Sequence, residues 1–292
     1  MNRAAIADML IMARMQGYAL GSFSPRNTYL IHWVLLAAQK QHSPVIVQIS
    51  SNELRWFGLS PAVFAKAFFR ETKELDVSAI LHLDHTYDFA VLREAVQAGF
   101  QSVMYDGSKL PFEENVTRTR EAAEYAHSQD VFLEAELGSI GGADKLETGG
   151  DEAHYTDPGQ AEEFVQKTDC DSLAVSIGTA HGVYAVRNPK IDFDRLERIS
   201  KRVQVPLVLH GGSGLPVETV NRAIQMKGSG GISKLNIATD LELTFQKTLG
   251  IGRIKDHEIC RLDPAQLLEA GKEVQILCED RIERYLLSSG NA

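Results

Sequence analysis

The chain has 292 residues, of which 44% are hydrophobic and 24% are charged, and its formal net charge is −9. This composition is ordinary for a globular protein, and the length fits one large α/β domain as well as two smaller ones. The sequence has no basic block and no interleaving of basic with aromatic residues. Nucleic acid and anionic membrane are therefore excluded as expected partners.

Compartment and redox state follow from two further features. No segment is apolar for long enough to span a bilayer, and Asp8 lies where a signal peptide needs its apolar core. Cys170, Cys260 and Cys278 are far apart and form no Cys-x-x-Cys motif. We therefore expect a cytoplasmic protein with reduced cysteines that serve in packing.

Taken in chain order, short aliphatic runs bounded by turn residues alternate with amphipathic segments. The runs predict buried parallel strands at 19–23, 45–50, 79–84, 102–106, 131–137, 172–177, 207–211 and 232–237. Helices are predicted at 28–41, 61–75, 89–98, 112–129, 158–167, 193–203 and 217–227. No Gly-x-Gly-x-x-Gly follows an early strand, so this alternation favours a (β/α)8 TIM barrel over a doubly wound sheet.

Helix starts are marked by capping residues, and two segments break the regular spacing. Asp88 precedes the third helix, and Asp157-Pro158 is an N-cap followed by proline at the first helical position. Residues 139–155 form a long, Gly-rich stretch after the fifth strand, which predicts a mobile lid over the barrel rim. We expect one domain over 1–292, with a helical C-terminal appendage at about 241–287.

Three histidines close predicted strands: His85, His181 and His210. The C-terminal ends of barrel strands meet at one rim, where catalytic groups collect. A lone histidine at a strand end is usually structural, but three on different strands, with Asp84 beside one, favour an open zinc site. Strict alternation turns His82 and Asp84 to one side and His85 to the other. We interpret His82 as a core residue or a support of the site.

Carboxylates end the neighbouring strands. Asp106 closes the fourth predicted strand, and Glu134 and Glu136 lie two residues apart on the fifth, so they face the same way. Burying two carboxylates inside a barrel is costly without a cation nearby. We place Asp106 and Glu136 at the site. For Glu134, a site role and a pairing with a neighbouring lysine or backbone group both stay open.

The loops after the last two strands are suited to an anion. Residues 210–214 read His-Gly-Gly-Ser-Gly, and residues 236–240 read Asn-Ile-Ala-Thr-Asp. Backbone amides and helix N-termini after strands seven and eight of a barrel commonly bind phosphate. Together the two loops predict a phosphate-binding site.

With these motifs the sequence resembles the class II, zinc-dependent ketose-bisphosphate aldolases, from about residue 45 to 240. The motifs are His-Leu-Asp-His at 82–85, Ser-Val-Met-x-Asp at 102–106, Glu-Ala-Glu-Leu-Gly at 134–138, Ser-Leu-Ala-Val-x-Ile-Gly-Thr-Ala-His-Gly at 172–182, Leu-Val-Leu-His-Gly-x-Ser-Gly at 207–214 and Lys-Leu-Asn-Ile-Ala-Thr at 234–239. The tagatose-bisphosphate branch is the most similar, because Ala238 stands where the other main branch has Asp.

The resemblance implies a TIM-barrel lyase that reversibly cleaves a ketohexose 1-phosphate into dihydroxyacetone phosphate and a three-carbon aldehyde. It implies Zn²⁺ on the three strand-end histidines, and a second metal or monovalent cation position at Asp106 and Glu136. Asp84 would move the C4 hydroxyl proton, and Asp144 in the lid would move the C3 proton. The implied substrate contacts are Arg26, Ser50, Gly182, Gly211, Gly212, Ser213, Asn236, Ile237, Ala238 and Thr239.

The sequence departs from the family pattern at the far end of the substrate. The family's Asp-Pro-Arg, whose arginine reaches the distal phosphate, is Asp263-Pro264-Ala265 here, and its Phe-Asn near the first strand is Phe23-Ser24. Arginine suits bidentate phosphate recognition, so a distal phosphate loses its expected partner. Arg26, Arg55 or Arg253 could replace the cation. The distal group is then a phosphate, as in tagatose or fructose 1,6-bisphosphate, or a sulfonate, as in 6-deoxy-6-sulfofructose 1-phosphate.

Two other function classes compete with the aldolase. A metal-dependent hydrolase on the same barrel generally needs a His-x-His pair on the first strand, which this chain lacks, although Asp240 loosely fits its last-strand aspartate. A non-catalytic sugar-phosphate-binding subunit would be expected to have lost ligands or the acid/base group, and none is missing. The resemblance also implies a homodimer or homotetramer, with the helical tail past Thr239 as the expected contact.

Overall fold

In the computed structural model, eight parallel strands close into a barrel in chain order, β1 pairing with β8. The structure describes residues 1–138, 154–182, 184, 189–226 and 230–292. The strands are β1 (Leu20–Phe23), β2 (Val45–Ser50), β3 (Ala79–Thr86), β4 (Ser102–Tyr105), β5 (Phe132–Leu137), β6 (Ser172–Val175), β7 (Leu207–Leu209) and β8 (Lys234–Ile237). The fold is the predicted (β/α)8 barrel.

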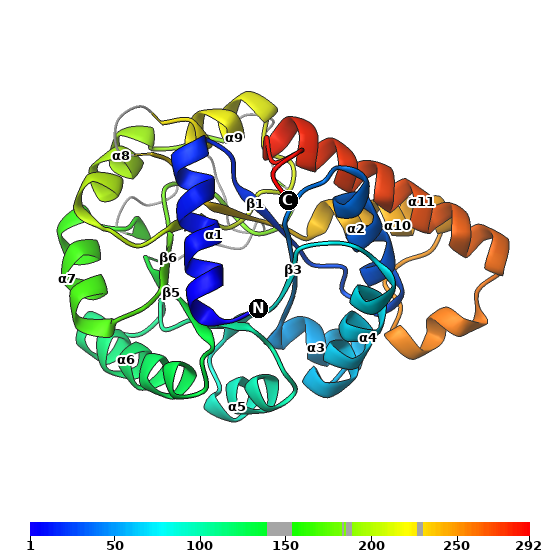
Figure 1. Cartoon of the computed structure of the whole chain (residues 1–292), viewed down its shortest axis with the longest axis horizontal. Helices are drawn as coiled ribbons and strands as arrows, with labels where there is room; N and C mark the ends of the chain where they lie inside the picture. Colours follow the sequence, from blue (N-terminus) through cyan, green and yellow to red (C-terminus); the bar gives the residue numbers. More distant parts are fainter. Residues whose placement is uncertain (139–153, 183, 185–188, 227–229) are drawn as a thin grey trace.

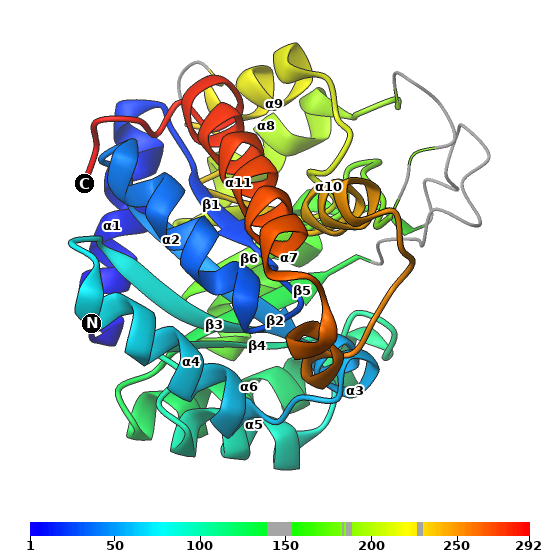
Figure 2. The same cartoon turned by 90° about the vertical axis from the view of Figure 1, so that its right-hand side faces the viewer.

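Helices surround the barrel on its outside (Figure 1). They are α1 (Arg3–Gln16), α2 (Tyr29–Lys40), α3 (Ser51–Phe57), α4 (Pro61–Glu74), α5 (Phe89–Gln97), α6 (Phe112–Ser128), α7 (Pro158–Thr168), α8 (Phe193–Arg202), α9 (Val217–Ile224), α10 (Thr239–Leu249) and α11 (Pro264–Asp280), with a 3₁₀ turn at η3 (Asp256–Arg261) and a π turn at η4 (Arg281–Tyr285). The C-terminal helix α11 packs along α2 and α10 (Figure 2). None of the helices in the described part of the chain is long and apolar enough to cross a membrane.

The first helix closes the N-terminal end of the barrel, a role that the strand and helix pattern did not predict. In Figure 1, α1 crosses in front of the strands. Its buried side chains Ile6 and Leu10 form an apolar cluster with strand residues that point down the barrel, including Leu20, Ile46 and Phe132. This plug seals the bottom, so the cavity opens at the C-terminal ends of the strands.

The outward-facing strand residues and the inner faces of the helices form the main hydrophobic core. Leu81 and Leu83 of β3 and Val45 and Val47 of β2 belong to it and are fully buried. Residues that alternate with them point into the barrel, as expected for a strand. The interior carries buried polar groups instead, among them Gln48.

Helix starts follow the predicted capping signals. The Asp157 carboxylate accepts hydrogen bonds from the backbone amides of Gly159 and Gln160 at 2.8 and 2.9 Å, with Pro158 at the first helical position. Asp88 caps α5 in the same way through Ala90. The strands start and end within a few residues of the predictions, and the differences fall at their ends, where regular pairing gives way to site loops.

Candidate active site

A cavity of about 750 Å³ opens at the C-terminal rim of the barrel. It is the position at which TIM-barrel enzymes place their catalytic groups. Most of the predicted site residues line it, and they come from the ends of all eight strands: Arg26, Ser50, Asp84, His85, Asp106, Glu136, His181, Gly182, Gly211, Ser213, Asn236, Ala238 and Thr239. Strand order thus gathers residues that lie far apart in the sequence, from Arg26 to Thr239.

Three imidazoles form a cluster at the floor of this cavity. The ring nitrogens of His85, His181 and His210 that face one another lie within 4.8 Å, and the two Nε2 atoms of His85 and His181 are 3.2 Å apart. His85 Nδ1 is hydrogen-bonded to Asp106 at 2.8 Å, and His210 Nε2 to Glu134 at 3.1 Å. For both residues the remaining ring nitrogen faces the cluster, as metal-ligating histidines require.

His85 reaches this cluster because β3 is irregular at its end. Strict alternation would turn His85 away from Asp84 and toward the helices. Instead the register with β4 shifts between Leu83 and Thr86, and His85 has a left-handed backbone with φ 27°. This bulge-like irregularity turns His85 into the same cavity as Asp84, which the expectation from alternation alone had missed.

The charges around the imidazoles suit a cation. Burial lowers the pKa of His85, but Asp84, Asp106 and Glu136 outweigh it and raise that pKa. Burial and the neighbouring Asp106 also raise the pKa of Glu136, whose Oε2 has no hydrogen-bond partner and lies 3.4 Å from His210 Nδ1. A buried carboxylate oxygen and a buried ring nitrogen that form no hydrogen bond and approach each other to 3.4 Å fit a site built for a metal ion.

Asp84 is fixed by two amides. Its Oδ2 accepts a hydrogen bond from Gln48 Nε2 and its Oδ1 one from Asn236 Nδ2, both at 3.0 Å. Gln48 in turn is bonded to the Ser22 hydroxyl. Asp84 therefore has a defined position on the cavity wall. It does not belong to the group of three histidines that could hold a metal ion.

A buried lysine lies beneath the imidazoles. Lys234 is 1% exposed, and its Nζ donates to Glu134 Oε2 at 2.7 Å and to His82 Nε2 at 3.1 Å. Burial and Lys234 hold the pKa of His82 well below its usual range, so its ring is neutral and hydrogen-bonded to Ser102 through Nδ1. Glu134 thus pairs with a lysine, one of the two outcomes left open, and also holds His210.

The loops after β7 and β8, which the sequence predicts to bind an anion, lie against each other. The Ser213 hydroxyl oxygen accepts from the backbone amides of Ala238 and Asp240, each at 3.2 Å, at the start of α10. Gly211 has φ 71°, and a Cβ there would lie 2.3 Å from the Ala180 carbonyl oxygen. Only glycine therefore permits this close approach of the loop after β7 to the loop after β6.

Some predicted contacts lie elsewhere. Ile237 is fully buried in the core between strands and helices, because it alternates with Asn236 along β8. Gly212 does not line the cavity, and its amide bonds the Asn236 carbonyl at 2.9 Å. Ala265 is exposed at the start of α11 and does not line the cavity either. Asp144 and most of the predicted lid lie outside the described residues.

The structure also adds residues that the motifs had missed. Asn52, Trp56, Tyr87, Lys109 and Glu242 line the cavity. They lie on loops and helices after the strands, where no pattern distinguishes them from surface residues. Gln48 also lines it, and there a signal existed: it is two residues before Ser50 on β2, and alternation puts both side chains on the inner face.

Comparison with known proteins agrees with this geometry. The sequence model of the family described as fructose-bisphosphate aldolase class-II matches residues 4–291. The chain belongs to the class II fructose-bisphosphate aldolase family. It is therefore an aldolase, a carbon–carbon lyase of a class that depends on a metal ion.

Individual relatives match over nearly their whole length. A fructose-bisphosphate aldolase of Geobacillus stearothermophilus is 36% identical over 274 residues, which cover 94% of this chain and 93% of that protein. The crystal structure of the YdjI aldolase of Escherichia coli K12 has a TM-score of 0.83 at 32% identity, with 98% of both chains covered. A putative fructose-1,6-biphosphate aldolase of Coccidioides immitis has a TM-score of 0.82 at 27% identity, covering 99% of this chain and 98% of that one.

Proposed function

We propose that this aldolase cleaves a ketohexose 1-phosphate with an anionic C6 group, giving dihydroxyacetone phosphate and a three-carbon aldehyde. Tagatose 1,6-bisphosphate, fructose 1,6-bisphosphate and 6-deoxy-6-sulfofructose 1-phosphate are the candidate substrates. The observation that carries the proposal is the placement of Asp84, the imidazole cluster and the Ser213 loop around one cavity.

Zinc is the metal that fits these residues best. Three neutral imidazoles with one open position are a common catalytic zinc set, and His85, His181 and His210 would hold the ion. A zinc ion bound there would act as a Lewis acid toward the negative charge that develops on the ketose fragment. Asp106 and Glu136, which also group with His85, are proposed to offer a position for a second metal or a monovalent cation.

The chain's own residues supply the proton transfers and the binding. Asp84 takes the C4 hydroxyl proton as the C3–C4 bond breaks, and returns it in the condensation direction. The two amides from Gln48 and Asn236 hold its carboxylate oxygens in place for that transfer. Asp144, in the predicted lid, is proposed to move the C3 proton.

The 1-phosphate is proposed to bind where the last two barrel loops meet. Gly182, Gly211 and Ser213 lie on one side of this part of the cavity, and Ala238 and Thr239 at the start of α10 on the other. A helix N-terminus that directly follows a barrel strand favours a phosphate group. Anchoring this end leaves the rest of the sugar to extend past the imidazoles toward β1 and β2.

The proposal is tested by a coupled assay for dihydroxyacetone phosphate over ketose 1-phosphates that differ only at C4 and C6. We expect activity to disappear after treatment with EDTA and to return on addition of Zn²⁺. Activity that survives complete removal of metal, verified by elemental analysis, would contradict the zinc assignment. A panel in which no ketose 1-phosphate is cleaved would contradict the proposed substrate class.

A further inference from the structure

We propose that Arg26 binds the far end of the substrate and that Glu242, by neutralising it, selects a singly charged terminal group over a phosphate. This inference rests on the proposed function and adds a specificity-determining pair to it. Four side chains carry it, and we call them the Arg–Glu cluster: Arg26, Glu53, Glu242 and Arg253. All four line the main cavity.

Arg26 is held rigidly in this cluster. Its Nε donates to Glu53 Oε1 at 2.6 Å, its Nη1 pairs with Glu242, and its side chain is 11% exposed. Its backbone has a left-handed φ of 61°, which is costly for a residue other than glycine. A strained backbone and two carboxylate partners fix one guanidinium at the cavity wall, as recognition of a substrate group requires.

Glu53 ties Arg26 to the part of the site that matches the family's distal contacts. Its Oε2 accepts from the Ser24 hydroxyl at 2.8 Å and from the Ser50 amide at 3.0 Å, while Ser50 Oγ accepts from the Glu53 amide. Burial raises the pKa of Glu53, but Arg26 and these hydrogen bonds outweigh it and lower that pKa, so the carboxylate stays charged. Arg26 is therefore linked through Glu53 to Ser24 and Ser50.

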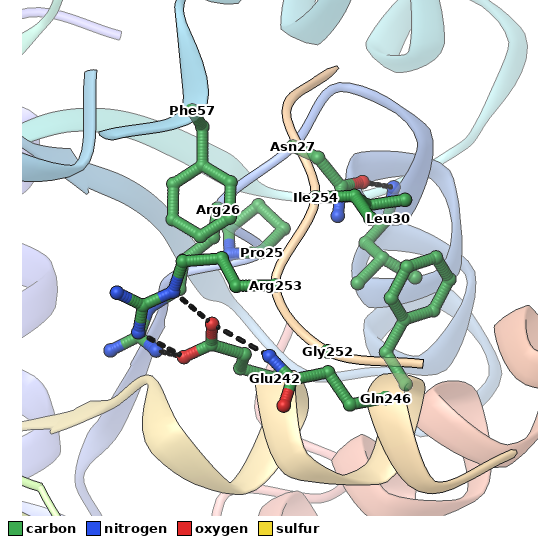
Figure 3. Close-up of a pocket in the computed structure, with 11 residues that line it drawn as sticks. Pro25, Arg26, Asn27, Leu30, Phe57, Glu242, Gln246, Gly252, Arg253 and Ile254 are labelled. Carbon is green, nitrogen blue, oxygen red and sulfur yellow. Dashed lines mark hydrogen bonds and ion pairs between the residues drawn. The ribbon is translucent and has the colours of Figure 1, made fainter. Parts of the chain in front are cut away.

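Glu242 shares its charge between two arginines. Arg253 donates to both of its carboxylate oxygens, at 2.6 and 2.9 Å, and Gln246 donates to Oε1 at 2.9 Å (Figure 3). Figure 3 shows the Arg253 guanidinium and the Glu242 carboxylate facing each other, with Arg26 beside them. Each Glu242 carboxylate oxygen therefore has two partners, and three of these four contacts come from arginine.

The formal charge of the Arg–Glu cluster is consequently zero: two guanidinium groups face two carboxylates. A phosphate dianion normally needs a bidentate arginine or several uncompensated cations. A sulfonate or carboxylate carries one charge and can use the remaining N–H groups of one fixed arginine. The net charge of the cluster thus favours a terminal monoanion.

Lys109 is the further cation among the described residues that line the cavity. It lies in the loop after β4, and its Nζ is 5.4 Å from the centre of the Tyr87 ring. In the barrel, β4 is separated from β1 by β2 and β3, so Lys109 and Arg26 enter the cavity from different sides. Binding of the C6 group by Lys109 is therefore the alternative that the experiment has to distinguish from binding by Arg26.

The experiment measures kcat and KM for ketohexose 1-phosphates that carry hydroxyl, sulfonate, carboxylate or phosphate at C6, using the zinc-loaded enzyme. We expect the sulfonate or the carboxylate to have the highest kcat/KM, and the panel itself distinguishes these two monoanions. Glu242→Gln should lower KM for the phosphate compound about tenfold, with little effect on the hydroxyl compound. Arg253→Met, which removes one positive charge, should raise KM for the phosphate compound instead.

Controls separate the proposal from its alternatives. Glu269→Gln removes one negative charge from an exposed position of α11 outside the cavity and should change no KM. Circular dichroism melting checks that each variant is folded. If Glu242→Gln does not fold, Arg253→Met tests the charge of the cluster instead, because the Arg253 side chain is 48% exposed. Arg26→Met should raise KM for the charged compounds and spare the hydroxyl compound.

Three results would overturn the inference. In the first, the phosphate compound is the best substrate of the unaltered enzyme and Glu242→Gln leaves its KM unchanged. In the second, Arg26→Met impairs all compounds equally, which would assign Arg26 to the shared 1-phosphate end. In the third, Lys109→Met removes the preference at C6. In all three the aldolase still cleaves ketose 1-phosphates, whereas no cleavage of any compound contradicts the proposed function itself.

Discussion

At the scale of single residues, the candidate site depends on side chains that hold the proposed metal ligands and the proposed acid/base group in place. Lys234 holds Glu134, and Glu134 holds His210 through Nε2, which leaves Nδ1 facing the cluster. Gln48 and Asn236 do the same for Asp84. The orientation of His210 and of Asp84 is therefore set by the side chains that hydrogen-bond to them. These hydrogen bonds are buried and therefore strong.

Asp84→Ala should abolish cleavage and preserve metal binding. We expect kcat to fall about 10²–10⁴-fold, because the C4 hydroxyl proton loses its acceptor. Metal content, measured by elemental analysis of the purified variant, should match that of the unaltered enzyme, since Asp84 is not in the imidazole group. Asp8→Ala, at an exposed position of α1, is the matched control. A loss of less than tenfold would argue against the acid/base role.

Lys234→Met should weaken the fold and the metal site together. Removing the lysine leaves Glu134 as an unpaired buried charge, which costs about 3–5 kcal/mol in the free energy of unfolding. Loss of the group that positions His210 through Glu134 should also lower zinc affinity about 10–100-fold. Urea unfolding of metal-free protein gives the first quantity, and competition with a chromophoric chelator gives the second.

A double variant tests whether the unpaired charge of Glu134 causes the loss of stability in Lys234→Met. Adding Glu134→Gln to Lys234→Met removes the unpaired carboxylate, so most of the lost stability should return while zinc affinity stays low. If both substitutions together destabilise the protein by the sum of their separate effects, the lysine acts by packing alone and the pairing argument is wrong.

At the scale of elements, the starts of two helices place residues of the site that are distant in the sequence next to each other. The N-terminus of α10 follows β8 directly, so its amides meet the Ser213 loop at the rim. The capping box of α3 pairs Ser50 with Glu53, which in turn holds Arg26. The two capping residues of α3, Ser50 and Glu53, therefore also line the cavity.

The N-cap of α7 offers a test at this scale that is independent of activity. Asp157→Ala removes the acceptor of two backbone amides and should cost about 1 kcal/mol of stability. The measurement is the midpoint of urea unfolding, with Asp8→Ala as a control that should stay within about 0.5 kcal/mol. An Asp157→Ala variant as stable as its control would show that Pro158 alone suffices to start the helix.

At the scale of the whole molecule, the barrel is closed at one end and open at the other. The plug by α1 leaves the C-terminal rim as the open end, and α10 and α11 add a layer outside β8 and β1 (Figure 2). We propose that residues 1–292 are one domain and that this layer, residues about 241–287, forms the contact between subunits.

Sedimentation velocity should therefore find a homodimer or homotetramer. Leu268 and Ile276 of α11 are 46% and 57% exposed, so they offer apolar side chains to a partner subunit. Ile276→Asp should shift the enzyme toward the monomer, because a charge in an apolar contact is not compensated. Met15→Asp, which changes a 75% exposed residue of α1, is the matched control. A monomeric unaltered enzyme would refute the expected assembly.

Periodicity and capping in the sequence predict the barrel, the order of its strands and the chemical types at the site, because both signals are local and parallel strands end at one rim. The folded barrel adds that His85 turns inward, that Glu134 pairs with Lys234, and that Arg26 lies between two carboxylates. Each of these depends on an irregular backbone or on a partner up to 216 positions away. Local patterns carry no information about such partners, since their contacts are fixed only when the barrel closes.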